Sequence, residues 1–188
     1  MNPAPEEEIG RILADEAVNR IGEHGEVGVL ADAGPGLFEA SRAGVSQRRK
    51  VLALTAVPGG NDDADRAFRL TRDLVRACPS VGLVVAFSPS AMSGGEAVLL
   101  SGRQRVKVIG VGEPVSGRRY LENGVAPLLI HWSARDLGYL TVYAAAFAGR
   151  HRPDPGADSI PAGRLGRREL CGGEIVLGQP IVERSRYP

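Results

Sequence analysis

The sequence predicts an α/β fold of three layers, in which helices cover both faces of a five-stranded, mainly parallel sheet. Segments with helical spacing of apolar residues alternate five times with short apolar runs, as in parallel strands joined by right-handed crossovers. The apolar runs are nearly continuous, which is typical of strands buried on both faces. At 188 residues, with 43% hydrophobic and 24% charged side chains, the chain is long enough for one buried core and too short for two full domains.

The elements follow one another in a regular order along the first two thirds of the chain. Helices are expected at residues 9–21, 37–49, 62–77, 90–100 and 116–123, and strands at 26–31, 51–57, 81–87, 106–111 and 126–132. Pro79 and Gly124 end the third and fifth of these helices. Ser90 can cap the fourth helix, which Gly94 and Gly95 weaken.

A sixth helix follows the fifth strand and runs to about Gly149. Ser133 and Asp136 have the S-x-x-D spacing of a helix capping pair at its start. Beyond it, residues 150–170 are rich in Pro, Gly and Arg, and residues 173–183 indicate two short strands or one strand interrupted by Pro180. The expected organisation is an α/β lobe at residues 1–132, followed at 133–188 by a helix and a tail with short strands.

Composition argues against several classes of partner and site. The formal net charge of +1 removes the electrostatic case for a nucleic-acid or polybasic membrane partner. Cys78 and Cys171 lie far apart without a C-x-x-C pair, so neither a zinc site nor a disulfide framework is expected. The first residues lack the pattern of a secretory signal, which predicts a cytoplasmic location for the chain as written.

Motifs of common enzyme classes are missing, so we expect no catalytic residue, metal or cofactor. The sequence has no G-x-x-x-x-G-K-[ST], G-x-S-x-G or H-E-x-x-H. The GPG motif at residues 34–36 is followed by Glu39 where a dinucleotide fingerprint has its third glycine, and a carboxylate there repels pyrophosphate. The acidic run at 61–65 is interpreted as capping of a helix start rather than metal binding. A structural role is the default for His24, His131 and His151.

Topology indicates where a ligand would bind. In an open parallel sheet, ligands lie beyond the carboxyl ends of the strands, where the strand order reverses. For a flavodoxin-like order, the loops concerned contain these candidates: Asp32, Ser88, Pro89 and Ser90, with Glu113 and Trp132 nearby. The alternative for Asp32 and Glu113 is a loop-end carboxylate bonded to backbone amides, and for Trp132 a packing residue.

Three motifs in the last third of the chain resemble the sugar solute-binding proteins of ABC importers. They are DLGYL at Asp136–Leu140, AGRLG at Ala162–Gly166 and VLGQPIV at Val176–Val182. The rhamnose-binding and autoinducer-sugar-binding subgroup is the most similar. The resemblance covers almost the whole chain and implies one lobe of a type I periplasmic binding protein, with the first part of the amino-terminal lobe absent.

The resemblance implies a non-catalytic protein that binds a monosaccharide, works with an ABC permease and lies in the periplasm or cell envelope. It carries the ligand role onto the following positions: the loop Asp32–Gly36, Phe87, Pro89, Gly112, Glu113 and Trp132. The first of these loops offers no side-chain donor in its GPG motif. Because an open half-cleft leaves the hydrogen bonds between protein and sugar in competition with water, we expect weak or undetectable monosaccharide binding.

In relatives, the helix after Trp132 packs on the amino-terminal lobe. Its apolar face here consists of Leu137, Leu140, Tyr143, Ala144 and Phe147. With that lobe absent, we expect the helix either to fold back onto its own sheet or to form a homo-oligomer through Asp136–Gly149. Three other identities stay open: a cytosolic sugar-sensing regulator domain of the same fold, an enzyme on a Rossmann-like sheet, and a non-functional gene fragment.

Overall fold

A computed structural model describes most of the chain. The described residues are 6–21, 26–31, 54–58, 63–89, 91–103, 105–150, 159–171 and 174–187. The helix expected at 37–49, the GPG motif and the candidates Asp32 and Ser90 lie outside these residues, as do His24 and His151.

The main sheet has six strands in the order β2-β1-β3-β4-β5-β9. Five of them are parallel: β1 (Glu26–Ala31), β2 (Leu54–Pro58), β3 (Val81–Ala86), β4 (Lys107–Val111) and β5 (Leu128–His131). This confirms the predicted α/β class and the flavodoxin-like order. The sixth strand, β9 (Ile181–Arg184), pairs antiparallel with β5.

The strand β9 adds an antiparallel edge to the five predicted parallel strands. It comes from the tail, because residues 181–184 return to the edge of the main sheet beside β5. An edge strand is covered less than a central one, and Ile181 is 44% exposed. The short segment after Pro180 therefore lacks the continuous apolar run that identifies the five parallel strands.

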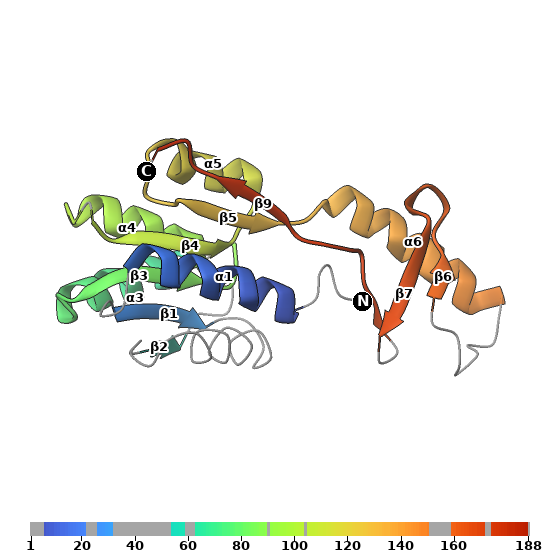
Figure 1. The fold of residues 1–188 in the computed structure, drawn as a ribbon, viewed down its shortest axis with the longest axis horizontal. Coiled ribbons are helices and arrows are strands. Elements are labelled where there is room, and N and C mark those ends of the chain that lie inside the picture. Colours follow the sequence, from blue (N-terminus) through green and yellow to red (C-terminus); the bar gives the residue numbers. More distant parts are fainter. Residues whose placement is uncertain are drawn as a thin grey trace.

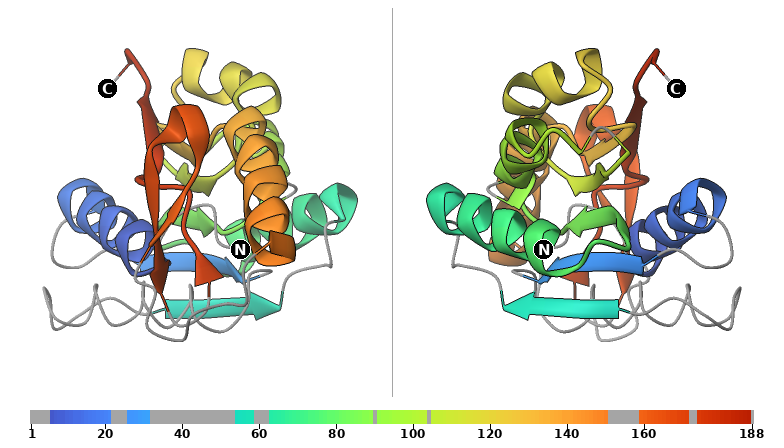
Figure 2. Two further views of the ribbon diagram at one scale, coloured as in Figure 1. Left: turned by 90° about the vertical axis from the view of Figure 1, so that its right-hand side faces the viewer. Right: turned by 90° about the vertical axis from the view of Figure 1, so that its left-hand side faces the viewer.

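Helices cover the two faces of the main sheet, as Figures 1 and 2 show. On one face lies α1 (Glu6–Ile21), whose residues Ile9, Leu13 and Ala17 belong to a buried cluster with strand residues. On the other face lie α3 (Ala64–Ala77), α4 (Gly94–Leu100) and α5 (Pro114–Glu122), which form a second buried cluster with the strands. The three predicted layers are confirmed.

The helix starts differ in detail from the expected ones. The segment expected to be one helix at 90–100 is a 3-10 turn, Ala91–Ser93, followed by α4. A Cβ atom at position 95 would lie 2.9 Å from Cδ1 of Tyr120, so this glycine lets α4 approach α5 closely. At the start of α3, the Asp63 carboxylate accepts a hydrogen bond from the Arg66 N–H at 3.0 Å, which confirms a capping role for this acid.

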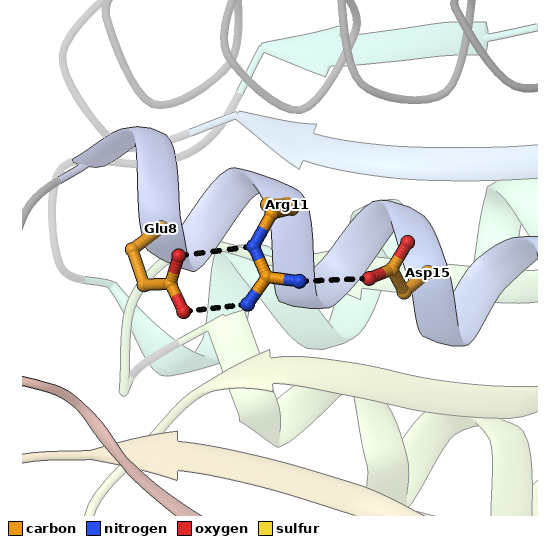
Figure 3. A network of polar contacts seen from close by, with 3 residues as sticks. All are labelled: Glu8, Arg11 and Asp15. Atoms are coloured by element: carbon orange, nitrogen blue, oxygen red, sulfur yellow. Dashed lines mark hydrogen bonds and ion pairs between the residues drawn. The ribbon is translucent and has the colours of Figure 1, made fainter.

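The solvent side of α1 has a row of ion pairs, drawn in Figure 3. Arg11 donates to Glu8 at 2.6 Å and to Asp15 at 3.2 Å, one turn away on either side. Pairs at three- and four-residue spacing stabilise a helix modestly. They mark the outer face of α1, opposite the apolar residues that contact the sheet.

The sixth helix, α6 (Ala134–Arg150), lies to one side of the main sheet with the tail packed against it (Figure 1). Its start is capped as expected, because the Ser133 hydroxyl accepts the Asp136 N–H at 3.1 Å. The tail forms a three-stranded antiparallel sheet of β6 (Ser159–Pro161), β7 (Arg167–Cys171) and β8 (Glu174–Ile175), with a 3-10 turn at Gly163–Leu165. Residues 173–183 thus contain two strands.

The tail supplies the neighbour of α6. Leu140 is fully buried in a cluster with Ala162 and Leu177. The expectation that α6 folds back onto the main sheet is therefore wrong. Val142, two residues after Leu140 and so on nearly the opposite side of the helix, stays 67% exposed, and Tyr143 is 37% exposed.

Membrane insertion of a helix is not indicated. Within the described ranges, no helix combines the length and the apolarity needed to cross a bilayer.

Candidate functional site

The predicted ligand residues follow the carboxyl ends of three neighbouring strands. Phe87, Ser88 and Pro89 come after β3, Gly112 and Glu113 after β4, and Trp132 after β5. Since β3, β4 and β5 are adjacent and parallel, these residues share one edge of the main sheet. That edge points toward the side on which α6 and the tail lie (Figure 1).

Trp132 lies at the junction between the main sheet and α6. Its side chain packs against the cluster beneath α1 and also against the cluster that contains Leu140. The packing role is therefore confirmed. The side chain is only half-buried, so part of it remains accessible at this edge.

Glu113 occupies the N-cap position of α5 without capping it. Its backbone is extended, with φ −85° and ψ 138°, and its carbonyl oxygen accepts the Gly117 N–H at 2.8 Å. The exposed carboxylate makes no hydrogen bond or ion pair with any described residue. The described residues thus give the Glu113 carboxylate none of the backbone-amide bonds that the loop-end alternative requires. A free carboxylate at this position can accept hydrogen bonds from hydroxyl groups of a ligand.

The remaining candidates differ in what they expose. Phe87 is only 4% exposed and belongs to the core cluster on the α1 side. Gly112 donates its N–H to the Ile130 carbonyl at 3.0 Å, and a Cβ there would lie 2.5 Å from Cδ1 of Leu129. Ser88 is half-buried and Pro89 exposed. Of the described candidates, Glu113 and Pro89 are therefore exposed, and Ser88 and Trp132 are partly accessible.

A polar and aromatic cluster close to Trp132 escaped the sequence analysis. The Arg164 guanidinium pairs with the Asp136 carboxylate and lies 4.4 Å from the centre of the Tyr139 ring, which neighbours Tyr143. The hydrogen bond from Arg164 holds the pKa of Asp136 below its ordinary value. The AGRLG motif contains Arg164, but only the fold shows that it contacts the first turns of α6.

The structure gives His131 a structural partner. Its Nε2 lies 3.2 Å from Glu183 Oε1, so the side chains join β5 to β9. Among the described residues, no group of three His, Cys, Asp or Glu side chains is placed to hold a metal ion.

A cavity of about 730 Å³ lies at the opposite edge of the main sheet, where the parallel strands begin. Its lining includes Gly82 near the start of β3 and Lys107 at the start of β4. None of the described candidate residues lines it. Because ligands of open parallel sheets bind beyond the carboxyl ends, we keep the carboxyl edge as the candidate sugar site.

Comparisons with solved structures agree with this architecture. A solute-binding protein of an ABC transporter from Clostridium phytofermentas, with bound L-rhamnose, superposes with a TM-score of 0.84 at 21% identity, over 100% of this chain and 65% of that one. A sugar ABC transporter protein from Actinomyces odontolyticus gives 0.79 at 21% identity, over 98% and 62%. A periplasmic solute-binding protein from Actinobacillus succinogenes, with bound D-allose, gives 0.73 at 18% identity, over 98% and 60%.

The chain thus spans between 60% and 65% of the length of these structures. At this identity the likeness shows the fold alone. A search among curated proteins found no match. The family model described as "Periplasmic binding protein domain" matches residues 4–151, which is most of the chain. The chain therefore belongs to the periplasmic binding protein domain family.

Proposed function

We propose that the chain is part of a non-catalytic sugar-binding protein of an ABC-type importer. Its ligand is a monosaccharide such as rhamnose or an autoinducer sugar, its partner is an ABC permease, and it works in the periplasm or cell envelope. The observation that carries the proposal is the Glu113 carboxylate, which has no partner among the described residues and lies at the same sheet edge as the accessible part of Trp132. Family membership and the rhamnose- and allose-bound structural relatives support it.

The chemistry of this edge suits a sugar. A carboxylate accepts hydrogen bonds from two hydroxyl groups at once, and such charge-assisted bonds are the stronger kind. An indole ring offers an apolar surface to the C–H face of a pyranose. Exposed Pro89 adds a rigid apolar neighbour on the adjacent strand end.

The same candidate residues limit the affinity for a sugar. Glu113 is the one predicted ligand residue in the described chain with an ionised side chain, and hydrogen bonds at an accessible edge compete with water. Tight sugar sites bury most of their ligand. We therefore expect a dissociation constant above about 1 mM, or roughly −4 kcal/mol, for the chain by itself.

Trp132 provides the readout, because it is the single tryptophan of the chain. Titration with L-rhamnose, D-ribose and an autoinducer sugar should change its fluorescence saturably for at least one sugar. Glu113→Gln should weaken that binding about fivefold through loss of one charge-assisted bond. The matched control is Glu122→Gln, an exposed glutamate at the far end of α5, which should leave binding unchanged.

Two results would overturn the proposal. One is that none of the sugars changes the Trp132 fluorescence saturably, even at the highest concentrations at which protein and sugar stay in solution. The other is equal weakening by Glu113→Gln and Glu122→Gln, which would remove the carboxyl edge from the site.

A further inference from the structure

The cavity at the amino edge of the main sheet has four basic side chains among its lining residues. Arg20 comes from the last turn of α1, Lys107 from the first residue of β4, Arg105 from the segment just before it, and Arg184 from the end of β9. Because β9 runs antiparallel to β5, its last residue lies at the edge where the parallel strands begin. Three separate segments thus bring four cations to one cavity of about 730 Å³.

One buried carboxylate organises two of these cations. Glu16 is 5% exposed and accepts hydrogen bonds from Arg20 Nε at 2.5 Å and from Arg184 Nη1 at 2.6 Å. Each contact uses one nitrogen of a guanidinium group that carries five N–H donors. Glu16 therefore fixes two guanidinium groups beside the cavity while most of their donors stay available.

Three other polar side chains of the cavity lining also keep hydrogen-bonding groups that no described residue occupies. Arg105 and Asn19 make no side-chain hydrogen bond or ion pair with any residue that the structure describes. Lys107 donates one hydrogen bond, to the Gly124 carbonyl at 2.8 Å, which leaves two of its three N–H donors. Ser80 is occupied, because its hydroxyl donates to the Glu26 carboxylate.

A structural role accounts for only part of the positive charge of the four basic residues that line the cavity. The end of α1 lies here, and a helix carboxyl terminus carries roughly half a negative charge that stabilises nearby cations such as Arg20. Glu16 neutralises about one more of the four cations. The cavity therefore retains a positive excess, although the whole chain has a formal net charge of only +1.

We propose that this cavity binds a phosphate-bearing small molecule. Guanidinium groups present paired N–H donors that match phosphate oxygens, and lysine adds a mobile point charge. The cavity volume falls within the range of small-molecule sites, roughly 300–1,000 Å³. This site lies at the edge opposite Glu113 and Trp132, and it is independent of the proposed sugar site.

Titration calorimetry with inorganic phosphate at constant ionic strength tests this proposal on the full chain. We expect saturable binding that Arg105→Ala and Lys107→Gln each weaken about threefold to tenfold. Arg69→Ala is the matched control, because Arg69 is an exposed arginine on α3, on the other face of the sheet. Since Arg105 is exposed and has no described partner, its variant should keep the thermal unfolding midpoint of the parent.

Absence of saturable phosphate binding would overturn the proposal, and so would equal weakening by Arg69→Ala and Arg105→Ala. The Trp132 fluorescence titration with sugars separates the two sites. Arg105→Ala should leave it unchanged, whatever the outcome with phosphate.

Discussion

At Gly110 in β4, the main sheet has no room for a side chain. Its φ is 155°, and a Cβ atom there would lie 1.8 Å from the carbonyl oxygen of Ala86 in β3. A backbone atom on the neighbouring strand cannot move aside without disturbing the β3–β4 ladder. The loops that carry Phe87 and Glu113 begin from these two strands, so the clash would also displace the candidate site.

Gly110→Ala should therefore lower the free energy of unfolding by about 2–4 kcal/mol. Gly138→Ala in α6 is the control, since a Cβ there meets nothing within 4 Å and alanine favours an exposed helix by about 0.5–1 kcal/mol. Urea unfolding of both variants measures the difference. A Gly110→Ala protein as stable as the parent would contradict the β3–β4 register.

At the scale of elements, Glu16 links α1 to the edge strand β9 through Arg184, a residue 168 positions away in the sequence. Burial by itself raises the pKa of Glu16, but the hydrogen bonds from Arg184 and Arg20 outweigh it and hold the pKa below the ordinary 4.5. A carboxyl group with a lowered folded-state pKa contributes stability that is fully present above its unfolded value. That contribution disappears as the pH falls below 4.5 and through the folded-state pKa.

Glu16→Gln should lower the free energy of unfolding at pH 7 by about 1–2 kcal/mol, because Arg20 and Arg184 lose their carboxylate partner. The loss is no larger because both arginines stay partly solvated. The difference from the parent should shrink when urea unfolding is repeated well below pH 4.5. Glu8→Gln is the control: its pair with Arg11 is exposed (Figure 3), and surface pairs contribute little. A loss from Glu16→Gln that is the same at both pH values would rule out the ion pairs as its cause.

The elements also show which signals a sequence carries. The five parallel strands were predictable because each is a nearly continuous apolar run, and α1 and α3 because their buried residues recur at helical spacing. The strand β9 was not, since an edge strand with Ile181 44% exposed has no such run. Its pairing with β5 depends on a contact across some fifty residues that no local pattern encodes.

The candidate site follows the same rule. Glu113 and Trp132 could be placed at one sheet edge because the carboxyl ends of parallel strands meet there. Whether the Glu113 carboxylate has a hydrogen-bond partner could not be predicted, because a free carboxylate and a capping carboxylate look alike in sequence. The amino-edge cavity escaped prediction altogether, because Arg20, Arg105 and Arg184 converge only after β9 joins the sheet.

At the scale of the whole molecule, α6 exposes two large side chains that its contact with the tail does not cover. Val142 is 67% exposed and Tyr143 37% exposed. We propose that the chain self-associates through the helix segment Asp136–Gly149. Sedimentation velocity should show a concentration-dependent dimer that Val142→Asp converts to a monomer.

Val115→Asp is the control for this change, since Val115 is 88% exposed on a different helix, α5. It should leave the dimer intact. A parent chain that stays monomeric at high concentration would contradict self-association through α6.

The central claim is that this chain carries one accessible side of a sugar site at the carboxyl edge of its sheet. Calorimetric titration of the chain with L-rhamnose tests it most directly. We expect weak, saturable binding with a dissociation constant above about 1 mM. Tight one-to-one binding, with a dissociation constant of about 1 μM or below, would contradict the claim, because such affinity requires an enclosed site.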